Sequence, residues 1–137
     1  DIGNVAVPTE ILQKTDRLTA EENHIMQRHT EVGERILQGI EEEDQGNDFI
    51  QMSKDIVKYH HENWDGTGYP TGISGEQIPL SAQIVNIVTS YCALTEERSY
   101  RNAFSKEDTF AIMKKEAQTK FNPQLYEVLF LIRRQLV

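Results

Sequence analysis

Apolar residues in the first half of the chain recur at helical spacing. They follow one another at intervals of four, three, four and four, which is typical of one face of a helix. The residues that carry this pattern are Ile25, His29, Val32, Ile36 and Ile40. Thr19, with Glu22 three residues later, has the form of a capping box before the pattern begins. The sequence therefore predicts a helix from Thr19 to about Ile40, followed by a loop over the acidic stretch 41–48.

The rest of the chain predicts further helices. A second begins at about Phe49, and a third begins after Pro79 and continues through Leu94. The second should direct one stripe inward, formed by Phe49, Met52, Ile56 and His60. Between these helices, residues 66–75 hold four of the eight glycines and are predicted to form a loop.

Two capping signals mark the last helices. Ser105, with Asp108 three residues on, predicts the start of a fourth helix. Asn122 followed by Pro123 predicts the start of a fifth, because proline is tolerated at the first helical position. Alternation of apolar and polar residues with a period of two is absent over any useful length. We therefore expect an all-α fold, a bundle of five or more helices.

Composition narrows the class of protein. A length of 137 residues suits one domain, and no apolar run approaches the roughly 18–20 residues that span a bilayer. Cys92 is the single cysteine, so no disulfide framework is expected, and a reducing, cytoplasmic location fits. We interpret this cysteine as a small packed hydrophobe rather than a reactive thiol.

A net charge of −8 argues against a nucleic-acid-binding surface, which needs an excess of lysine and arginine. An anionic substrate could still bind if metal ions or a local basic cluster reversed the field. Whether an anionic substrate binds therefore depends on the local charge of its site.

Histidines provide the candidate chemistry. His29 and His60 fall on the predicted inward faces of two helices, and His61 adjoins His60. Each alone could be a hydrogen-bonded core histidine, but three beside a glycine-rich loop favour metal ligation, because imidazole is the commonest side-chain metal ligand near neutral pH. With the carboxylate of Asp1, the donor set suits iron, manganese, nickel or zinc, and such centres support phosphodiester hydrolysis. His24 lies off the stripe and is predicted to be solvent-exposed.

One string of residues resembles a known signature, that of the HD-GYP family of bacterial metal-dependent phosphodiesterases associated with cyclic di-GMP. It reads His60-His61-Glu62-x-x-Asp65-Gly66-x-Gly68-Tyr69-Pro70. The likeness covers nearly the whole chain, through segments that include Asp1-Ile2-Gly3, His29-x-Glu31-x-Gly33, Ile78-Pro79-Leu80-Ser81-Ala82 and Phe121-x-Pro123. The resemblance implies the HD-domain helical bundle.

The resemblance also implies roles for individual residues. Asp1 is similar to the aspartate of the His-Asp pair, a bridging metal ligand whose histidine partner would precede this chain. Three further ligands would be His29, His60 and His61. The metal would be a divalent ion, iron or manganese.

Other positions would bind substrate or partners. The family uses its GYP loop to shape the site and to meet partners such as GGDEF domains; the matching residues here are Gly66, Gly68, Tyr69 and Pro70. Arg98 and Arg101 lie where positive charge could meet substrate phosphates, although arginines in such a turn are more often surface residues.

Three positions depart from the family pattern. Asn4 replaces the lysine that assists at the phosphate, and asparagine carries no charge. Thr89 and Cys92 replace two aspartates, and the first of these is a metal ligand in the family. A neutral hydroxyl is a poor substitute for a carboxylate ligand, and changes around a metal centre typically cost 10–100-fold in affinity or activity.

These departures leave two interpretations. In the first, the chain is a degenerate HD-GYP-type domain in cyclic di-GMP signalling, with metal binding partial or lost, weak or no hydrolysis, and a binding or interaction role. In the second, it is an active phosphodiesterase that opens cyclic di-GMP to linear dinucleotide or GMP. Since Asp1 is not an initiator methionine, we expect residues 1–137 to be an N-terminally truncated domain of a longer protein with a sensory or receiver domain upstream.

Overall fold

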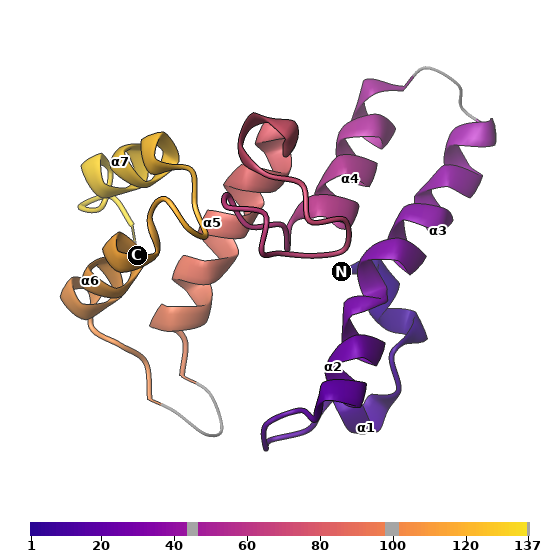
Figure 1. The fold of residues 1–137 in the computed structure, drawn as a ribbon, viewed down its shortest axis with the longest axis horizontal. Coiled ribbons are helices and arrows are strands. Elements are labelled where there is room, and N and C mark those ends of the chain that lie inside the picture. The colour runs from indigo at the N-terminus through magenta and orange to yellow at the C-terminus, as the bar shows by residue number, and fades with distance from the viewer. Residues whose placement is uncertain (44–46, 98–101, 137) are drawn as a thin grey trace.

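The computed structural model describes residues 1–43, 47–97 and 102–136, and the secondary structure of these residues is helical (Figure 1). Two 3₁₀ helices, η1 and η2, accompany seven α-helices in this part of the chain. In order the elements are η1 (Ile2–Ala6), α1 (Thr9–Leu12), α2 (Ala20–Gln27), α3 (His29–Glu43), α4 (Asp48–Tyr59), η2 (Gly75–Gln77), α5 (Leu80–Thr95), α6 (Lys106–Glu116) and α7 (Pro123–Leu131). The described residues form no strand, only an isolated bridge between Ala117 and Phe121. The all-α prediction is confirmed.

The predicted caps begin the helices as expected. The Thr19 hydroxyl accepts from the Glu22 backbone N–H at 3.2 Å, and the Glu22 carboxylate accepts from the Thr19 N–H at 2.7 Å, which completes the capping box of α2. Ser105 accepts from the Asp108 N–H at the start of α6. Asn122 caps α7, with Pro123 at its first position. None of the helices in the described residues is long and apolar enough to cross a membrane.

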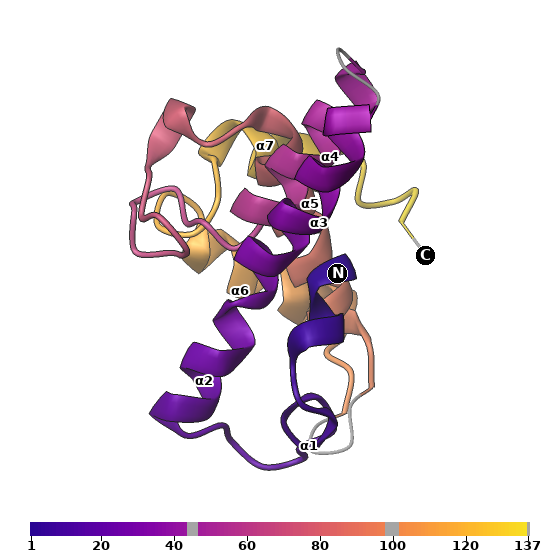
Figure 2. The same cartoon turned by 90° about the vertical axis from the view of Figure 1, so that its right-hand side faces the viewer.

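The first predicted helix is in fact two, α2 and α3, which meet at Arg28 and follow one another with a modest change of direction (Figures 1 and 2). The Arg28 N–H donates to the Ile25 carbonyl, three residues back, at 3.3 Å. The Met26 carbonyl accepts from the ring of His29 at 2.7 Å. Because a side chain takes this carbonyl, the break fixes the orientation of His29.

One boundary, the end of α3, and two buried positions were predicted wrongly, whereas α4 begins within one residue of the predicted Phe49. The loop predicted over 41–48 is shorter, since α3 continues to Glu43 and α4 begins at Asp48; residues 44–46 lie outside the described part. Phe49 and Met52 are not inward, because their exposed fractions are 73% and 54%. They belong to the first two turns of α4, the end of that helix remote from the histidines that follow Tyr59.

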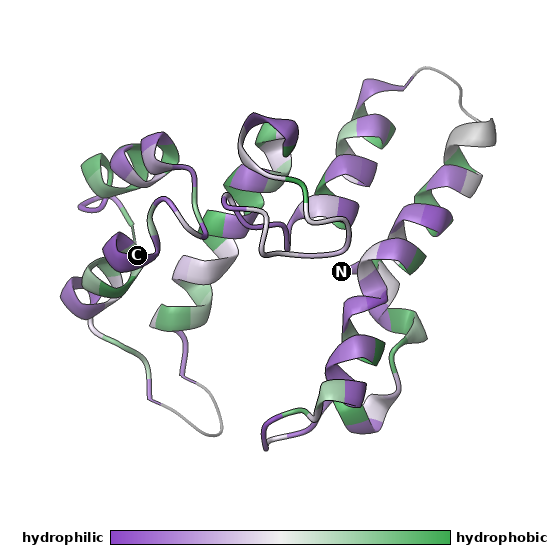
Figure 3. Ribbon diagram, viewed as in Figure 1, coloured by the Kyte–Doolittle hydropathy of each residue, from purple (hydrophilic) through white to green (hydrophobic). Residues whose placement is uncertain are grey.

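The main hydrophobic core joins α5, α6 and α7. Its buried members are Ile87, Tyr91, Phe110, Met113, Phe121, Tyr126 and Leu129. Figure 3 shows longer hydrophobic stretches on α5 than on α3 and α4, where purple bands alternate with green. Cys92, on α5, is exposed rather than packed as predicted, because α5 turns the neighbouring Tyr91 into the core instead.

The N-terminal part packs by close backbone approach. Helix α3 lies against α4 and against η1. A Cβ placed on Gly3 would lie 1.8 Å from the His29 carbonyl oxygen and 2.8 Å from the Gly33 nitrogen. Only glycine allows this contact, so the sequence Asp1-Ile2-Gly3 places the chain start directly beside His29.

Candidate metal centre

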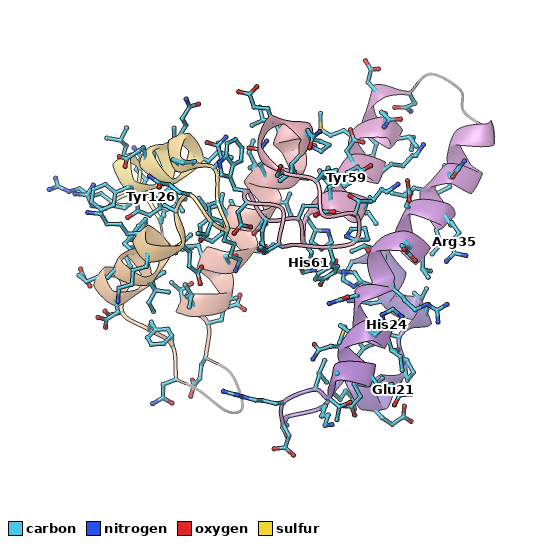
Figure 4. The ribbon with its side chains drawn as sticks, in the orientation of Figure 1. Glu21, His24, Arg35, Tyr59, His61 and Tyr126 are labelled. Carbon is cyan, nitrogen blue, oxygen red and sulfur yellow. The ribbon has the colours of Figure 1, made fainter. Side chains whose placement is uncertain are left out.

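Three histidines converge at the junction of α3, the end of α4 and the loop that follows. His29 is the first residue of α3, His60 is the C-cap of α4, and His61 comes next. One ring nitrogen from each lies within 4.8 Å of those of the other two. Ring centroids are 5.5 Å apart for His29 and His60, and 4.1 Å for His60 and His61. Figure 4 places His61 near the middle of the molecule, whereas His24 lies on α2 and is exposed, as predicted.

Backbone carbonyls set the tautomers of two rings. His60 Nδ1 lies 2.9 Å from the Ile56 carbonyl oxygen and 3.1 Å from that of Val57. His29 Nδ1 lies 2.7 Å from the Met26 carbonyl oxygen. A carbonyl only accepts, so Nδ1 must carry the proton in each ring and Nε2 of the neutral ring presents a lone pair.

The Nε2 atoms of His29 and His60 lie close to the carboxylate of Asp1. Asp1 Oδ1 lies 3.2 Å from His60 Nε2 and 3.8 Å from His29 Nε2. The His29 Nε2 is buried and has no hydrogen-bond partner. Acceptors that face one another repel unless a proton or a metal cation lies between them, and a buried unpaired polar atom costs about 1–3 kcal/mol. The donor set therefore fits a divalent metal ion.

Burial keeps the rings neutral. It is the largest cause that lowers the pKa of His29 and of His60 below the ordinary value of 6.5. The pKa of His61 falls to about 3, first through burial and then through the nearby His60 and His29 and the charge of Lys120. Metal ligation requires the neutral imidazole, so all three rings have the form that binds a metal at pH 7.

The loop after His61 is fixed by Glu62, a nearly fully buried carboxyl group. Its Oε1 accepts from the Thr71 N–H and from the Thr71 hydroxyl, both at 2.7 Å, and from the Gly72 N–H at 3.1 Å. The Asn86 side chain on α5 donates to the Glu62 backbone carbonyl at 2.6 Å. Glu62 and Asn86 thus tie the residue after His61 to the loop at residues 71–72 and to α5, and sequence reasoning assigned neither of them a role.

The predicted GYP-loop residues shape this site. The Tyr69 ring stacks on His61 with centroids 4.8 Å apart and 15° between the planes. A Cβ on Gly68 would lie 2.3 Å from the Asn63 nitrogen, and Gly66 has φ of +83°, so both positions require glycine. Tyr69 and Pro70 also line a small cavity with His24 and Arg28 at the junction of α2 and α3.

Thr89 lines the cavities beside the histidines. One cavity of about 370 Å³ is bounded by His60, His61 and Thr89, and a second of about 250 Å³ adds Asp1. The Thr89 hydroxyl donates to the Val85 and Asn86 carbonyls, at 2.8 and 3.1 Å. The hydroxyl hydrogen is used within α5, and no carboxylate stands at this position of the wall.

The remaining predicted residues either do not line the two cavities or lie outside the described part. Asn4 lies in η1 and is half-buried; its backbone bonds to Asp1 and Val7, and it is not among the described residues that line the two cavities. Arg98 and Arg101 lie outside the described residues. A cation that sequence reasoning missed, Lys120, lines the larger cavity.

The chain belongs to the HD domain family, whose model matches residues 1–125. Curated relatives confirm the HD-GYP resemblance. A cyclic di-GMP phosphodiesterase of Vibrio cholerae is 35% identical over 137 residues, which are 100% of this chain and 28% of the relative. A cyclic di-GMP phosphodiesterase response regulator of Xanthomonas campestris is 36% identical over 99% of this chain and 35% of its own length.

Another relative acts on a different cyclic dinucleotide. A 3'3'-cGAMP-specific phosphodiesterase of Vibrio cholerae is 37% identical over 94% of this chain and 24% of its own length. A crystal structure of a cyclic GMP-AMP specific phosphodiesterase from the same organism matches with a TM-score of 0.55 and 15% identity, over 96% of this chain and 33% of that one. This match supports the fold. The chain spans about a quarter to a third of the length of these relatives.

Proposed function

We propose that this chain is an HD-GYP-type domain that binds a divalent metal ion and a cyclic dinucleotide, and that it hydrolyses the dinucleotide weakly or not at all. The observation that carries the proposal is the meeting of unpaired lone pairs at Asp1, His29 and His60, beside the neutral Thr89. The unpaired lone pairs support metal binding, and the neutral Thr89 supports impaired hydrolysis.

Asp1, His29, His60 and His61 would hold the metal, which we propose to be iron or manganese. A metal there would supply positive charge for a phosphodiester and an activated water. The chain itself keeps the imidazoles neutral and Asp1 close to them. The Met26 carbonyl orients the His29 ring, the Ile56 carbonyl orients the His60 ring, and the Tyr69 ring stacks on His61.

Weak hydrolysis follows from the charges that are missing. Thr89 adds no carboxylate to the wall that it shares with His60 and His61, and Asn4 and Cys92 also lack the charges of the family pattern. Fewer anionic ligands hold a metal less firmly and position it less well. A domain that binds without rapid turnover would act by interaction, with GGDEF-type or other signalling proteins as the proposed partners.

Metal content and dinucleotide binding test this proposal together. Full-length protein is loaded anaerobically with Fe²⁺ or Mn²⁺, desalted and assayed by mass spectrometry for metal, then titrated calorimetrically with cyclic di-GMP. We expect both to bind, and His60→Ala to lose metal by more than tenfold. The matched control His24→Ala changes an exposed histidine of α2 that is outside the group of three histidines, and it should retain the metal. Equal metal content in the wild type and His60→Ala would contradict the proposal.

A second function is favoured by the relatives. An active phosphodiesterase for cyclic di-GMP or 3'3'-cGAMP is consistent with the complete set of three histidines and with relatives named for these activities. The two functions differ in one quantity, the metal-dependent turnover of the wild-type protein beside an active relative.

A further inference from the structure

A single cation stands in the larger cavity beside the histidines. Of the described residues that line this cavity of about 370 Å³, Lys120 is the only lysine or arginine. The lining also includes His61, Thr89 and Ser90 of α5, and the carboxylate of Glu116 on α6. The cavity volume is within the range of small-molecule sites, and in a chain with a net charge of −8 a phosphate there needs a local positive charge.

The turn that carries Lys120 is fixed to the loop of the metal centre. The Trp64 N–H donates to the Lys120 carbonyl at 3.1 Å, and the Asp65 N–H donates to the Thr119 carbonyl at 2.9 Å. The next residue, Phe121, is buried in the core at 2% exposure. Backbone bonds on one side and a buried ring on the other hold Lys120 beside the segment that contains His61.

The local conformation of this turn is also specific. Gln118 has φ of +82°, in the region that side chains rarely adopt. Its N–H donates to the Phe121 carbonyl at 3.1 Å, which closes the turn around Thr119 and Lys120. Such a conformation persists only where the surrounding structure determines it, so the position of Lys120 is set by the fold.

The ammonium group is available to an anion. Its present ionic partner is Glu116, with Lys120 Nζ 3.9 Å from Glu116 Oε2 and both side chains about two-fifths exposed, at 38% and 41%. Exposed pairs at this distance contribute little, and often nothing measurable. A phosphate in the cavity would form a shorter, charge-assisted bond with the same lysine.

We propose that Lys120 binds a phosphate of the cyclic dinucleotide and supplies, from the turn before α7, positive charge that Asn4 does not supply from the start of the chain. The proposal rests on the proposed function, since it takes the dinucleotide as the ligand. Lys120 is a substrate-binding residue in this account and has no role in holding the metal.

Calorimetric titration of Mn²⁺-loaded full-length protein with cyclic di-GMP tests the proposal. Lys120→Gln should raise the Kd about tenfold with unchanged metal content, and Lys120→Arg should restore most of the affinity because it restores the charge. The matched control Lys115→Gln, which removes an exposed lysine of α6, should leave the Kd unchanged. The difference between wild type and Lys120→Gln should shrink at high salt, as expected for a screened charge.

The outcomes separate the two proposals. If the wild type binds and Lys120→Gln binds equally well, the role of Lys120 is wrong and the proposed function stands. Equal weakening by Lys120→Gln and Lys115→Gln, or no recovery in Lys120→Arg, would also overturn it. If metal-loaded wild type does not bind cyclic di-GMP or 3'3'-cGAMP, the proposed function fails and the role of Lys120 fails with it.

Discussion

At the scale of single residues, the site depends on where protons are held. His29 and His60 each donate Nδ1–H to a backbone carbonyl, which leaves Nε2 toward Asp1. Burial lowers the pKa of each ring, so the metal does not have to displace protons at neutral pH. The same burial makes the metal-free protein sensitive to acid.

The stability of metal-free protein should fall as pH decreases below about 6.5. The pKa of His61 is about 3 when folded and returns to the ordinary 6.5 when unfolded, so between these values the unfolded state binds more protons. The free energy of unfolding then decreases by up to about 1.4 kcal/mol per pH unit, and this group has no effect above pH 6.5. Urea denaturation in EDTA at pH 7 and pH 5 measures the difference.

His61→Gln identifies the source of that difference. This variant should lose part of the pH dependence, whereas His24→Gln, on the exposed face of α2, should keep the wild-type dependence. The same decrease between pH 7 and pH 5 in wild type and His61→Gln would contradict the assignment.

The neutral Thr89 can be replaced by the aspartate of the family pattern. Thr89→Asp should increase metal retention and cyclic di-GMP turnover by at least tenfold, because it adds a carboxylate to the wall shared with His60 and His61. Asn4→Lys in addition should increase turnover further. The control Thr89→Asn has nearly the shape of aspartate without its charge and should give no gain. Equal turnover in Thr89→Asp and Thr89→Asn would mean that the missing carboxylate is not what limits the site.

At the scale of elements, the site depends on how closely η1 approaches α3. Gly3→Ala should lower the free energy of unfolding by more than about 2 kcal/mol, since the new Cβ would lie 1.8 Å from the His29 carbonyl oxygen. The change should also move Asp1 away from the histidines and reduce metal content. Urea denaturation and metal analysis of the same samples measure both.

Gly39→Ala is the matched control within α3. A Cβ there meets no atom within 4 Å, and alanine is preferred to glycine inside a helix, so stability should rise by about 0.5–1 kcal/mol. A Gly3→Ala variant as stable as the wild type would show that η1 can withdraw without cost, contrary to the close packing seen here.

Local signals in the sequence predicted where helices begin, whereas long-range packing decided which side chains are buried and which hydrogen bonds the loops form. Capping residues such as Thr19 and Ser105 act within a single turn, so their helix starts were read correctly. The exposure of Phe49 depends on which neighbours reach the first turn of α4, which periodicity does not contain. Glu62 was visible in the signature, but its bonds to Thr71 and Gly72 depend on the path of the loop.

The candidate site shows the same division. His29, His60 and His61 were predicted and lie together, because a shared motif and helical spacing bring them to one place. Lys120 was missed, since it is 59 residues after His61 in the sequence and reaches the cavity only through the turn before α7. A resemblance transfers positions that match a motif, and it has no means of finding a residue that lies outside the motif.

At the scale of the whole molecule, the histidines and the main core lie in different parts of the fold. The apolar cluster belongs to α5, α6 and α7, whereas the histidines come from α3 and the end of α4 (Figure 1). Helix α5 contributes to both, with Tyr91 in the core and Thr89 in the cavity wall. Changes at Thr89 can therefore alter the chemistry while the core of the domain stays intact.

The most direct test of this account is the turnover of cyclic di-GMP by full-length protein loaded anaerobically with iron or manganese. Products are followed by chromatography beside an active relative under the same conditions. We predict that the protein binds metal and dinucleotide but forms linear dinucleotide or GMP at least tenfold more slowly than the relative. Metal-dependent hydrolysis at the rate of the relative would contradict the central claim and identify the chain as a working phosphodiesterase despite Thr89.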